Sequence, residues 1–248
     1  CDIFQGQLQT YHDYADPMPE EFAKQIDEMV VGYLKEIGMY NGVRYGIPQE
    51  AGNFQQLYIN VDMFKAAGLD PDSPPKTFDE LKEMAKKLTQ YDESGNIKVA
   101  GFAIRYSGEG QGIADKNLCI IHSFGGKMFD AESRKASGFA NSPETIEAVS
   151  WIRSLLDEKI TNLEIGIPET AFGQGIAAMI MRESWVVGYL QNNAPNINFK
   201  VYPIPVKRKE VGAGNLFPWA HLVYKDSPNK DVAWKFLQFL YQDASYDL

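Results

Sequence analysis

Residue types that support catalysis or metal binding are present but scattered along the chain. The three histidines, His12, His122 and His221, are far apart, and the sequence contains no HExxH motif and no close Cys or His partners with metal-ligand spacing. None of the serines lies in a G-x-S-x-G nucleophile elbow. The sequence therefore predicts no bound metal and no cofactor.

Carboxylates are the most abundant chemically active groups, with 33 Asp and Glu residues. A glycosidase needs only two of them at the right separation, so a carbohydrate-active hydrolase stays open as an alternative. Most of these carboxylates fall in the first turns of expected helices or on polar faces, where carboxylates are solvated. We therefore expect a protein that binds rather than an enzyme.

A glycine-rich run, SGEGQG, occupies residues 107–112. Its glycines Gly108, Gly110 and Gly112 do not follow the G-x-G-x-x-G spacing, and no P-loop Lys comes after them. The run is therefore interpreted as a polar loop rather than a phosphate cradle.

Aromatic residues make up 12% of the chain, and several lie in polar or glycine-rich loops rather than at core-periodic positions. Sugars present apolar C–H faces and a rim of hydroxyls, so a sugar site combines flat rings with planar amides and carboxylates. Trp151 and Trp234 lie within amphipathic patterns and are expected to be core or surface cover. The loop rings are Tyr45, Phe54, Tyr106, Trp185, Phe217 and Trp219.

The elements that must position these rings are clearest between Gly42 and Thr89. Asn60 is expected to cap a short helix that ends at a left-handed Gly68. Thr77 and Glu80 form a capping box for the next helix. Its buried face is predicted from helical spacing to consist of Phe78, Leu81, Met84, Ala85 and Leu88.

The rest of the chain alternates between strand and helix patterns, which predicts an α/β fold with largely parallel sheets. Helices are expected at 19–31 and 115–124, and two more are expected to start at Ser142 and at Ser227. The helix after Ser142 is predicted to face inward with Ile146, Val149, Ile152 and Leu156. The helix after Ser227 is predicted to face inward with Val232, Phe236, Leu237 and Leu240. Strands are expected at 98–106, 176–181, 199–204 and 219–224, with a strand or loop at 2–8 and Ser184 starting a helix.

Composition bounds the function further. The chain has 248 residues, 44% of them hydrophobic and 23% charged, and its net charge is -9. An acidic chain argues against nucleic acid as a partner, because phosphates call for a basic surface. No apolar run approaches the ~20 residues that span a bilayer.

The two cysteines have different interpretations. Cys119 lies in an apolar run and is predicted to be a buried thiol. Cys1 leaves two readings open: a lipid-anchored first residue, as in bacterial lipoproteins, or a chain that starts inside a domain. We favour the second, because the residues after Cys1 read as a strand leading to a polar loop.

Seven segments, in order, resemble the extracellular solute-binding proteins of sugar ABC transporters, the maltose-binding-protein-like group. They are YGIP (45–48), LYIN (57–60), MFKAAGLDP (63–71), PPKTFDEL (74–81), FGQGIAAMIMRESW (172–185), YPIP (202–205) and SPNKDVAWKFLQFL (227–240).

The resemblance implies a two-lobed, type II periplasmic-binding-protein-like α/β fold. Lobe one would comprise residues 1–103 and 213–248, and lobe two residues 104–212, with a hinge where the chain crosses between them. The family's opening strand-helix-strand portion and its last helices would be missing, so the natural protein is expected to be longer at both ends.

The implied function is capture of a mono- or oligosaccharide and its delivery to an ABC permease, by a monomer in the periplasm or outside the cell. The protein would meet the membrane only through the permease or a lipid on Cys1. Alternatives are another polar solute, such as a polyamine or an amino-sugar, and the hydrolase.

The resemblance also implies site residues. Trp185 matches a stacking platform, Asn53 a polar contact before the LYIN strand, and Glu183 and Gln111 partners for sugar hydroxyls. For Asn53, Gln111 and His221, loop packing or solvent exposure is an equal alternative. Further ligand-binding candidates at the two expected crossings are Phe54, Gly214, Asn215, Phe217, Trp219 and His221.

Overall fold

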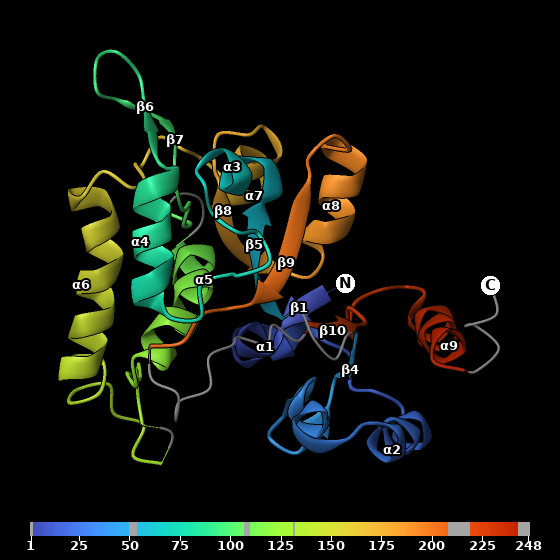
Figure 1. Ribbon diagram of the computed structural model, residues 1–248. Helices are drawn as coiled ribbons and strands as arrows, with labels where there is room; N and C mark the ends of the chain where they lie inside the picture. Colours follow the sequence, from blue (N-terminus) through green and yellow to red (C-terminus); the bar gives the residue numbers. More distant parts are fainter. Residues whose placement is uncertain (1, 50–53, 107–109, 131, 208–218, 243–248) are drawn as a thin grey trace. The chain divides into compact units, whose positions relative to one another are not determined.

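The structure is a computed structural model that describes residues 2–49, 54–106, 110–130, 132–207 and 219–242. The chain divides into two compact units (Figure 1). The first unit comprises Cys1–Asn53 and Leu216–Leu248, and the second comprises Phe54–Asn215. Each unit has its own sheet and its own core.

The first unit contains a three-stranded antiparallel sheet in the order β1-β10-β4. Its largest core cluster lies where α2 and α9 pack over Ile47 of β4, through Phe22, Ile26, Trp234 and Leu237. The elements are β1 (Asp2–Phe4), α1 (Gln5–Tyr11), 3-10 turns at His12–Tyr14 and Gly32–Glu36, α2 (Glu20–Met29), the β2 (Met39–Tyr40) and β3 (Val43–Arg44) hairpin, β4 (Gly46–Pro48), β10 (Trp219–Leu222) and α9 (Lys230–Leu240).

The last helix differs from its prediction in start and orientation. It begins at Lys230 rather than at Ser227. Val232 and Phe236, predicted to face inward, are 65% and 57% exposed, whereas the buried residues are Trp234 and Leu237. Two apolar stripes run along α9, and the indole of Trp234 is fixed inward because its Nε1 donates a hydrogen bond of 2.9 Å to Asp16.

The second unit is built on the sheet β8-β5-β9, with helices on both faces (Figure 1). On one face, Leu57 and Ile59 pack with residues of α4, α5 and α6. On the other, Tyr58 packs with Phe172 of α7 and Leu190 of α8. The elements are β5 (Gln55–Asn60), α3 (Val61–Ala66), α4 (Phe78–Leu88), β6 (Gln90–Tyr91), β7 (Ile97–Val99), α5 (Gly110–Ser123), α6 (Pro143–Asp157), α7 (Pro168–Gly173), β8 (Met179–Glu183), α8 (Val186–Asn193) and β9 (Phe199–Pro203).

The expectation of largely parallel sheets is wrong for the described ladders, which are antiparallel. β8, α8 and β9 do form a strand-helix-strand unit, as the alternation indicates. However, β5 lies between β8 and β9 and pairs antiparallel with each of them. The two strands of the unit are therefore parallel to one another without being neighbours.

The local signals between Gly42 and Thr89 are confirmed. The side chain of Asn60 accepts hydrogen bonds from the backbone N–H groups of Asp62 and Met63. Thr77 and Glu80 form both bonds of the capping box. Gly68 has φ +72°, the left-handed conformation expected after α3. The predicted face of α4 is buried except for Met84, which packs at the edge of the core.

The predicted inward face of α6 is wrong by one residue. Ser142 caps the helix as expected, but Ile146 and Val149 are 56% and 51% exposed. The buried positions are Thr145, Ala148, Trp151 and Leu155. The ring of Trp151 packs edge-on against Phe78 at 4.9 Å between centroids, which turns this stripe inward. At 15 residues α6 is the longest described helix, and no described helix is long and apolar enough to cross a membrane.

Two other segments are less regular than expected. Of the segment 98–106, only its start belongs to a strand, β7; Ala100 and Ala103 then form isolated parallel bridges with Ala177 and Ile180. At the N-terminus, the expected strand or loop at 2–8 is the short strand β1 followed directly by α1.

The compact units differ from the predicted lobes. The predicted division at Ala103 assigns β5 to lobe one and its partners β8 and β9 to lobe two. In the structure β5 is the central strand between β8 and β9, because both of its faces are apolar and need cover. The contact boundary accordingly lies at Asn53.

Cys119 is a free and fully buried thiol, as predicted. Burial raises its pKa to about 12, so the thiolate is disfavoured at neutral pH. Its position in the core next to α6 assigns it to packing.

Candidate functional site

Aromatic and polar side chains meet at the edge of the second unit's sheet where β5 begins and β8 ends. The register pairs Gln55 with Glu183. Phe54 directly precedes β5 and is 58% exposed; Trp185 lies two residues after Glu183 and is 44% exposed. The antiparallel pairing therefore brings two exposed rings to the ends of two neighbouring strands.

Gln55 and Glu183 continue the sheet face that packs against α5. Side chains alternate along a strand, so Gln55 shares its face with Leu57, and Glu183 shares its face with Met181. Beyond this apolar core, the face meets Lys116 of α5. The Gln55 amide donates a hydrogen bond of 3.0 Å to the Lys116 carbonyl, and the Lys116 ammonium pairs with the Glu183 carboxylate.

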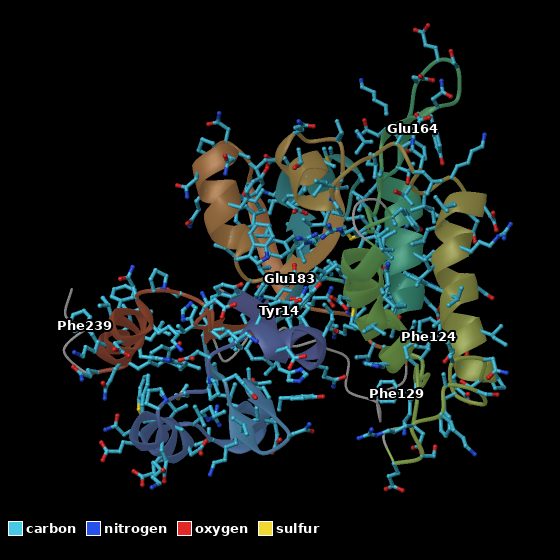
Figure 2. All side chains as sticks on the ribbon, turned by 180° about the vertical axis from the view of Figure 1, so that it is seen from behind. Tyr14, Phe124, Phe129, Glu164, Glu183 and Phe239 are labelled. Carbon is cyan, nitrogen blue, oxygen red and sulfur yellow. The ribbon has the colours of Figure 1, made fainter. Side chains whose placement is uncertain are left out.

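Glu183 is a buried carboxylate held by two cations (labelled in Figure 2). Its side chain pairs with Lys116 and with the Arg182 Nε at 3.1 Å. Burial alone would raise the pKa of Glu183, but the charges of Arg182 and Lys116 outweigh it and hold the pKa below its ordinary value. Glu183 is therefore ionised at neutral pH.

Arg182 lies on the opposite face of β8 and is 3% exposed. Its Nη1 lies 3.0 Å from the Glu169 carboxylate of α7. Its Cζ lies 5.4 Å from the centre of the Trp185 ring, a cation–π geometry. The Trp185 ring also meets Tyr189 edge-on, at 6.0 Å between centroids and 81° between planes.

This chemistry suits recognition of a polyhydroxylated ligand better than catalysis. An exposed indole beside buried amide and charged groups is the combination that sugar sites use. A glycosidase needs a carboxyl group with a raised pKa as its proton donor, whereas the pKa of Glu183 is lowered. Within the described ranges, no group of three or more His, Cys, Asp or Glu side chains could hold a metal ion.

The structure brings together three of the predicted site residues, Phe54, Glu183 and Trp185. Trp219 and His221 lie on β10 of the first unit, where His221 Nδ1 is 3.4 Å from the Tyr241 hydroxyl. Four other candidates lie outside the described residues: Asn53, Gly214, Asn215 and Phe217. Gln111 lies in α5, but its side chain is not described.

The expectation that Ser184 caps the following helix is wrong. The N-cap residue of α8 is Trp185, and no side chain accepts a hydrogen bond there. The turn is instead fixed by the Tyr58 hydroxyl, which donates a bond of 2.8 Å to the Glu183 carbonyl. Burial, with Glu183 nearby, raises the pKa of Tyr58, so the hydroxyl stays protonated.

Sequence reasoning missed Gln55, Lys116, Glu169 and Arg182. For Gln55 a signal existed in the sequence. It follows Phe54 and alternates with Leu57 and Ile59, so Gln55, Leu57 and Ile59 lie on the same face of the strand. Lys116 and Glu169 carry no such signal, because their partners lie far away in sequence on another element. Arg182 lies next to its partner Glu183 in the sequence, but its burial and its pairing with Glu169 depend on the fold.

The chain is similar over most of its length to known binding proteins. It is 43% identical over 194 residues to the sn-glycerol-3-phosphate-binding periplasmic protein of Escherichia coli K12, covering 74% of this chain and 42% of that protein. It is 24% identical over 229 residues to the maltotriose-binding protein of Pyrococcus abyssi, covering 90% and 46%. The chain thus spans about half the length of these curated relatives.

Solved structures share the fold. An ABC transporter solute-binding protein of Thermotoga lettingae, bound with α-D-tagatose, matches with a TM-score of 0.83 at 25% identity, covering 99% of this chain and 63% of that one. Such neighbours are two-lobed, mixed α/β binding proteins. A family model described as bacterial extracellular solute-binding protein matches residues 2–246. Since the match runs through both units and both strands of the site, the chain belongs to the bacterial extracellular solute-binding protein family.

Proposed function

We propose that this protein captures a neutral mono- or oligosaccharide outside the cytoplasm and delivers it to an ABC permease without chemical change. The protein acts as a monomer in the periplasm or at the cell surface.

The observation that carries the proposal is the Trp185 indole. It is 44% exposed at the end of a buried strand, and it is contacted by Arg182 over the ring and by Tyr189 edge-on. An apolar ring that stays open beside buried polar groups has no packing role for its exposed part. A sugar ring that stacks on it would bury that surface and leave its hydroxyls near polar side chains.

The relatives support a carbohydrate as the ligand. Among those that this chain resembles are a maltotriose-binding protein and a solute-binding protein solved with α-D-tagatose. Both are proteins of transport rather than catalysis, which agrees with the lowered pKa of Glu183.

A second candidate is a phosphorylated solute, because the 43% identical relative is an sn-glycerol-3-phosphate-binding protein. The cations described at the site favour the neutral ligand. Lys116 faces Glu183, and Arg182 faces both Glu183 and Glu169, so each positive charge is matched by a carboxylate. A polyamine or an amino-sugar is the further alternative.

We also propose that the remaining predicted residues contact the ligand from loops and from β10. These are Asn53, Phe54, Gln111, Phe217, Trp219 and His221. Glu183 was expected to contact sugar hydroxyls too, but at 1% exposed and paired with Lys116 and Arg182 it supports the site from within.

A thermal-shift panel tests the proposal. It compares neutral sugars, sn-glycerol 3-phosphate, polyamines, nucleotides and simple ions. A ligand at ~100 times its dissociation constant adds ~2.7 kcal/mol of stability, which for a chain of this size raises the melting temperature by about 5–10 °C. We expect this rise with a neutral sugar alone, and chromatography should recover a bound oligosaccharide uncut. A rise with the phosphate ester or a polyamine alone would refute the sugar proposal.

A further inference from the structure

The Trp185 ring is held by two neighbours that are themselves fixed. Arg182 lies 5.4 Å from the ring centre, and Tyr189 meets the ring edge-on at 6.0 Å. The 44% of the side chain that remains exposed is therefore a surface with a set orientation.

Both neighbours are anchored to consecutive residues of α7. Glu169 pairs with Arg182 Nη1 at 3.0 Å, and the Thr170 hydroxyl lies 3.4 Å from the Tyr189 hydroxyl. The helix is itself packed into the second core through Ala171 and Phe172, which are 1% and 0% exposed. The chain of contacts thus runs from the core, through α7, to the two groups that touch the indole.

We infer that Arg182 is a positioning residue for ligand binding: clamped by Glu169 and Glu183, it holds the Trp185 ring in the orientation on which a sugar stacks. The effect on sugar binding rests on the proposed function, whereas the orientation of the Trp185 ring by Arg182 does not.

The burial of Arg182 separates this role from direct contact with the ligand. At 3% exposed, its guanidinium has no surface to offer to a sugar. Its Nε donates a hydrogen bond to Glu183, and its Nη1 forms an ion pair with Glu169. The planar fork matters as well as the charge, because Lys cannot hold two carboxylates and stack on a ring at once. A ring fixed before binding loses less conformational entropy when the ligand arrives.

The experiment compares Arg182→Lys with Arg44→Lys. Arg44 is a matched control, since it is 4% exposed, pairs with Asp27 and belongs to the other unit. Tyr189→Leu serves as a second variant that removes the edge contact and leaves the ion pairs intact. Each protein is labelled with 5-fluorotryptophan, and Trp185→Phe assigns the Trp185 signal among the four tryptophans by ¹⁹F NMR.

In Arg182→Lys and Tyr189→Leu, the Trp185 signal should shift or broaden while the other signals stay. The dissociation constant of the sugar found by the panel should rise about two- to fivefold, the range expected from loss of a cation–π contact. Arg44→Lys should lose stability with neither effect. If Arg182→Lys does not fold, Glu169→Gln decides, because it removes the carboxylate at Arg182 Nη1 and keeps the guanidinium. An unchanged Trp185 signal and an unchanged dissociation constant would overturn the inference. Since the ¹⁹F signal needs no ligand, a wild type that binds no sugar would end the proposed function and still leave this test to run.

Discussion

Replacement of Trp185 by Ala is the most direct perturbation of the site. The side chain is 44% exposed, and a large aromatic side chain has about 250 Å² of surface, so about 110 Å² is open to a ligand. At about 25 cal/mol per Å², covering that area contributes at most about 2.7 kcal/mol. We expect a loss of about 2 kcal/mol in binding free energy, a roughly thirtyfold weaker complex.

The same change has a cost in stability that must be separated from the loss of affinity. The buried part of the ring contacts Arg182 and Tyr189. Complete removal of a core indole costs about 3–5 kcal/mol, so a half-buried one should cost about 2 kcal/mol. A domain with a typical stability of ~5–15 kcal/mol remains folded at 25 °C after this loss.

Isothermal titration calorimetry at 25 °C measures the affinity, and urea unfolding verifies that the variant is folded. Phe236→Ala is the matched control, because Phe236 is 57% exposed on α9 of the first unit. It should bind the sugar like the wild type. If Trp185→Ala bound within twofold of the wild type while its stability fell, the indole would be a packing residue and our reasoning would be refuted.

Three further predictions concern charge, register and reactivity. Because the pKa of Glu183 is lower in the folded state, its ionised form stabilises the fold above the unfolded pKa of about 4.5, and this stabilisation is lost as pH falls through the folded pKa. In urea unfolding between pH 3 and 7, the free energy of unfolding should therefore fall less steeply with acid in Glu183→Gln than in the wild type. Parallel pH dependences would contradict this. Leu155→Ala should cost about 2–5 kcal/mol and Val149→Ala under about 0.5 kcal/mol, as measured by denaturation; equal costs would reject the observed register of α6. In a Cys1→Ser background, Cys119 should react with Ellman's reagent only on unfolding, and fast labelling of the native protein would show otherwise.

Local chemistry predicted the starts of α3, α4 and α6, since a cap needs only neighbours in sequence, but it failed at Ser184 and Ser227. Asn60 bonds to N–H groups two and three residues on, and Thr77 and Glu80 satisfy one another within one turn. Ser142 likewise accepts from Thr145. These bonds form wherever the helix forms, and the rest of the fold does not change them.

The buried side of a helix is different when two apolar stripes compete. In α6, Ile146 and Val149 belong to one stripe and Trp151 and Leu155 to its neighbour. Periodicity cannot choose between them, because both repeat with the same spacing. The choice was made by Phe78, on a helix some 70 residues away, whose ring packs edge-on against Trp151.

At the candidate site, the sequence predicted the exposed ring but not the charges around it. Trp185 was predicted from the motif that ends β8, and the structure places it at the open end of that strand. The partners of Glu183 come from β8 itself and from α5, and α7 supplies the carboxylate opposite Arg182. No local pattern connects these elements, so their charge pairing could only be seen in the fold.

The pairing of those charges also explains how an acidic protein can keep two cations beside the candidate site. A buried cation pays the cost of desolvation whether or not it is paired. A carboxylate partner offsets that cost by its attraction and cancels the charge that would attract anions. Glu183 and Glu169 lie on opposite faces of β8 and neutralise Lys116 and Arg182 from both sides. The positive charges then orient side chains, Arg182 beneath the Trp185 ring and Lys116 against the end of β8, while the surface offered to the ligand is an indole. Because the buried charges are paired and the exposed surface is an aromatic ring, the site favours a neutral ligand that stacks on the ring over a charged one.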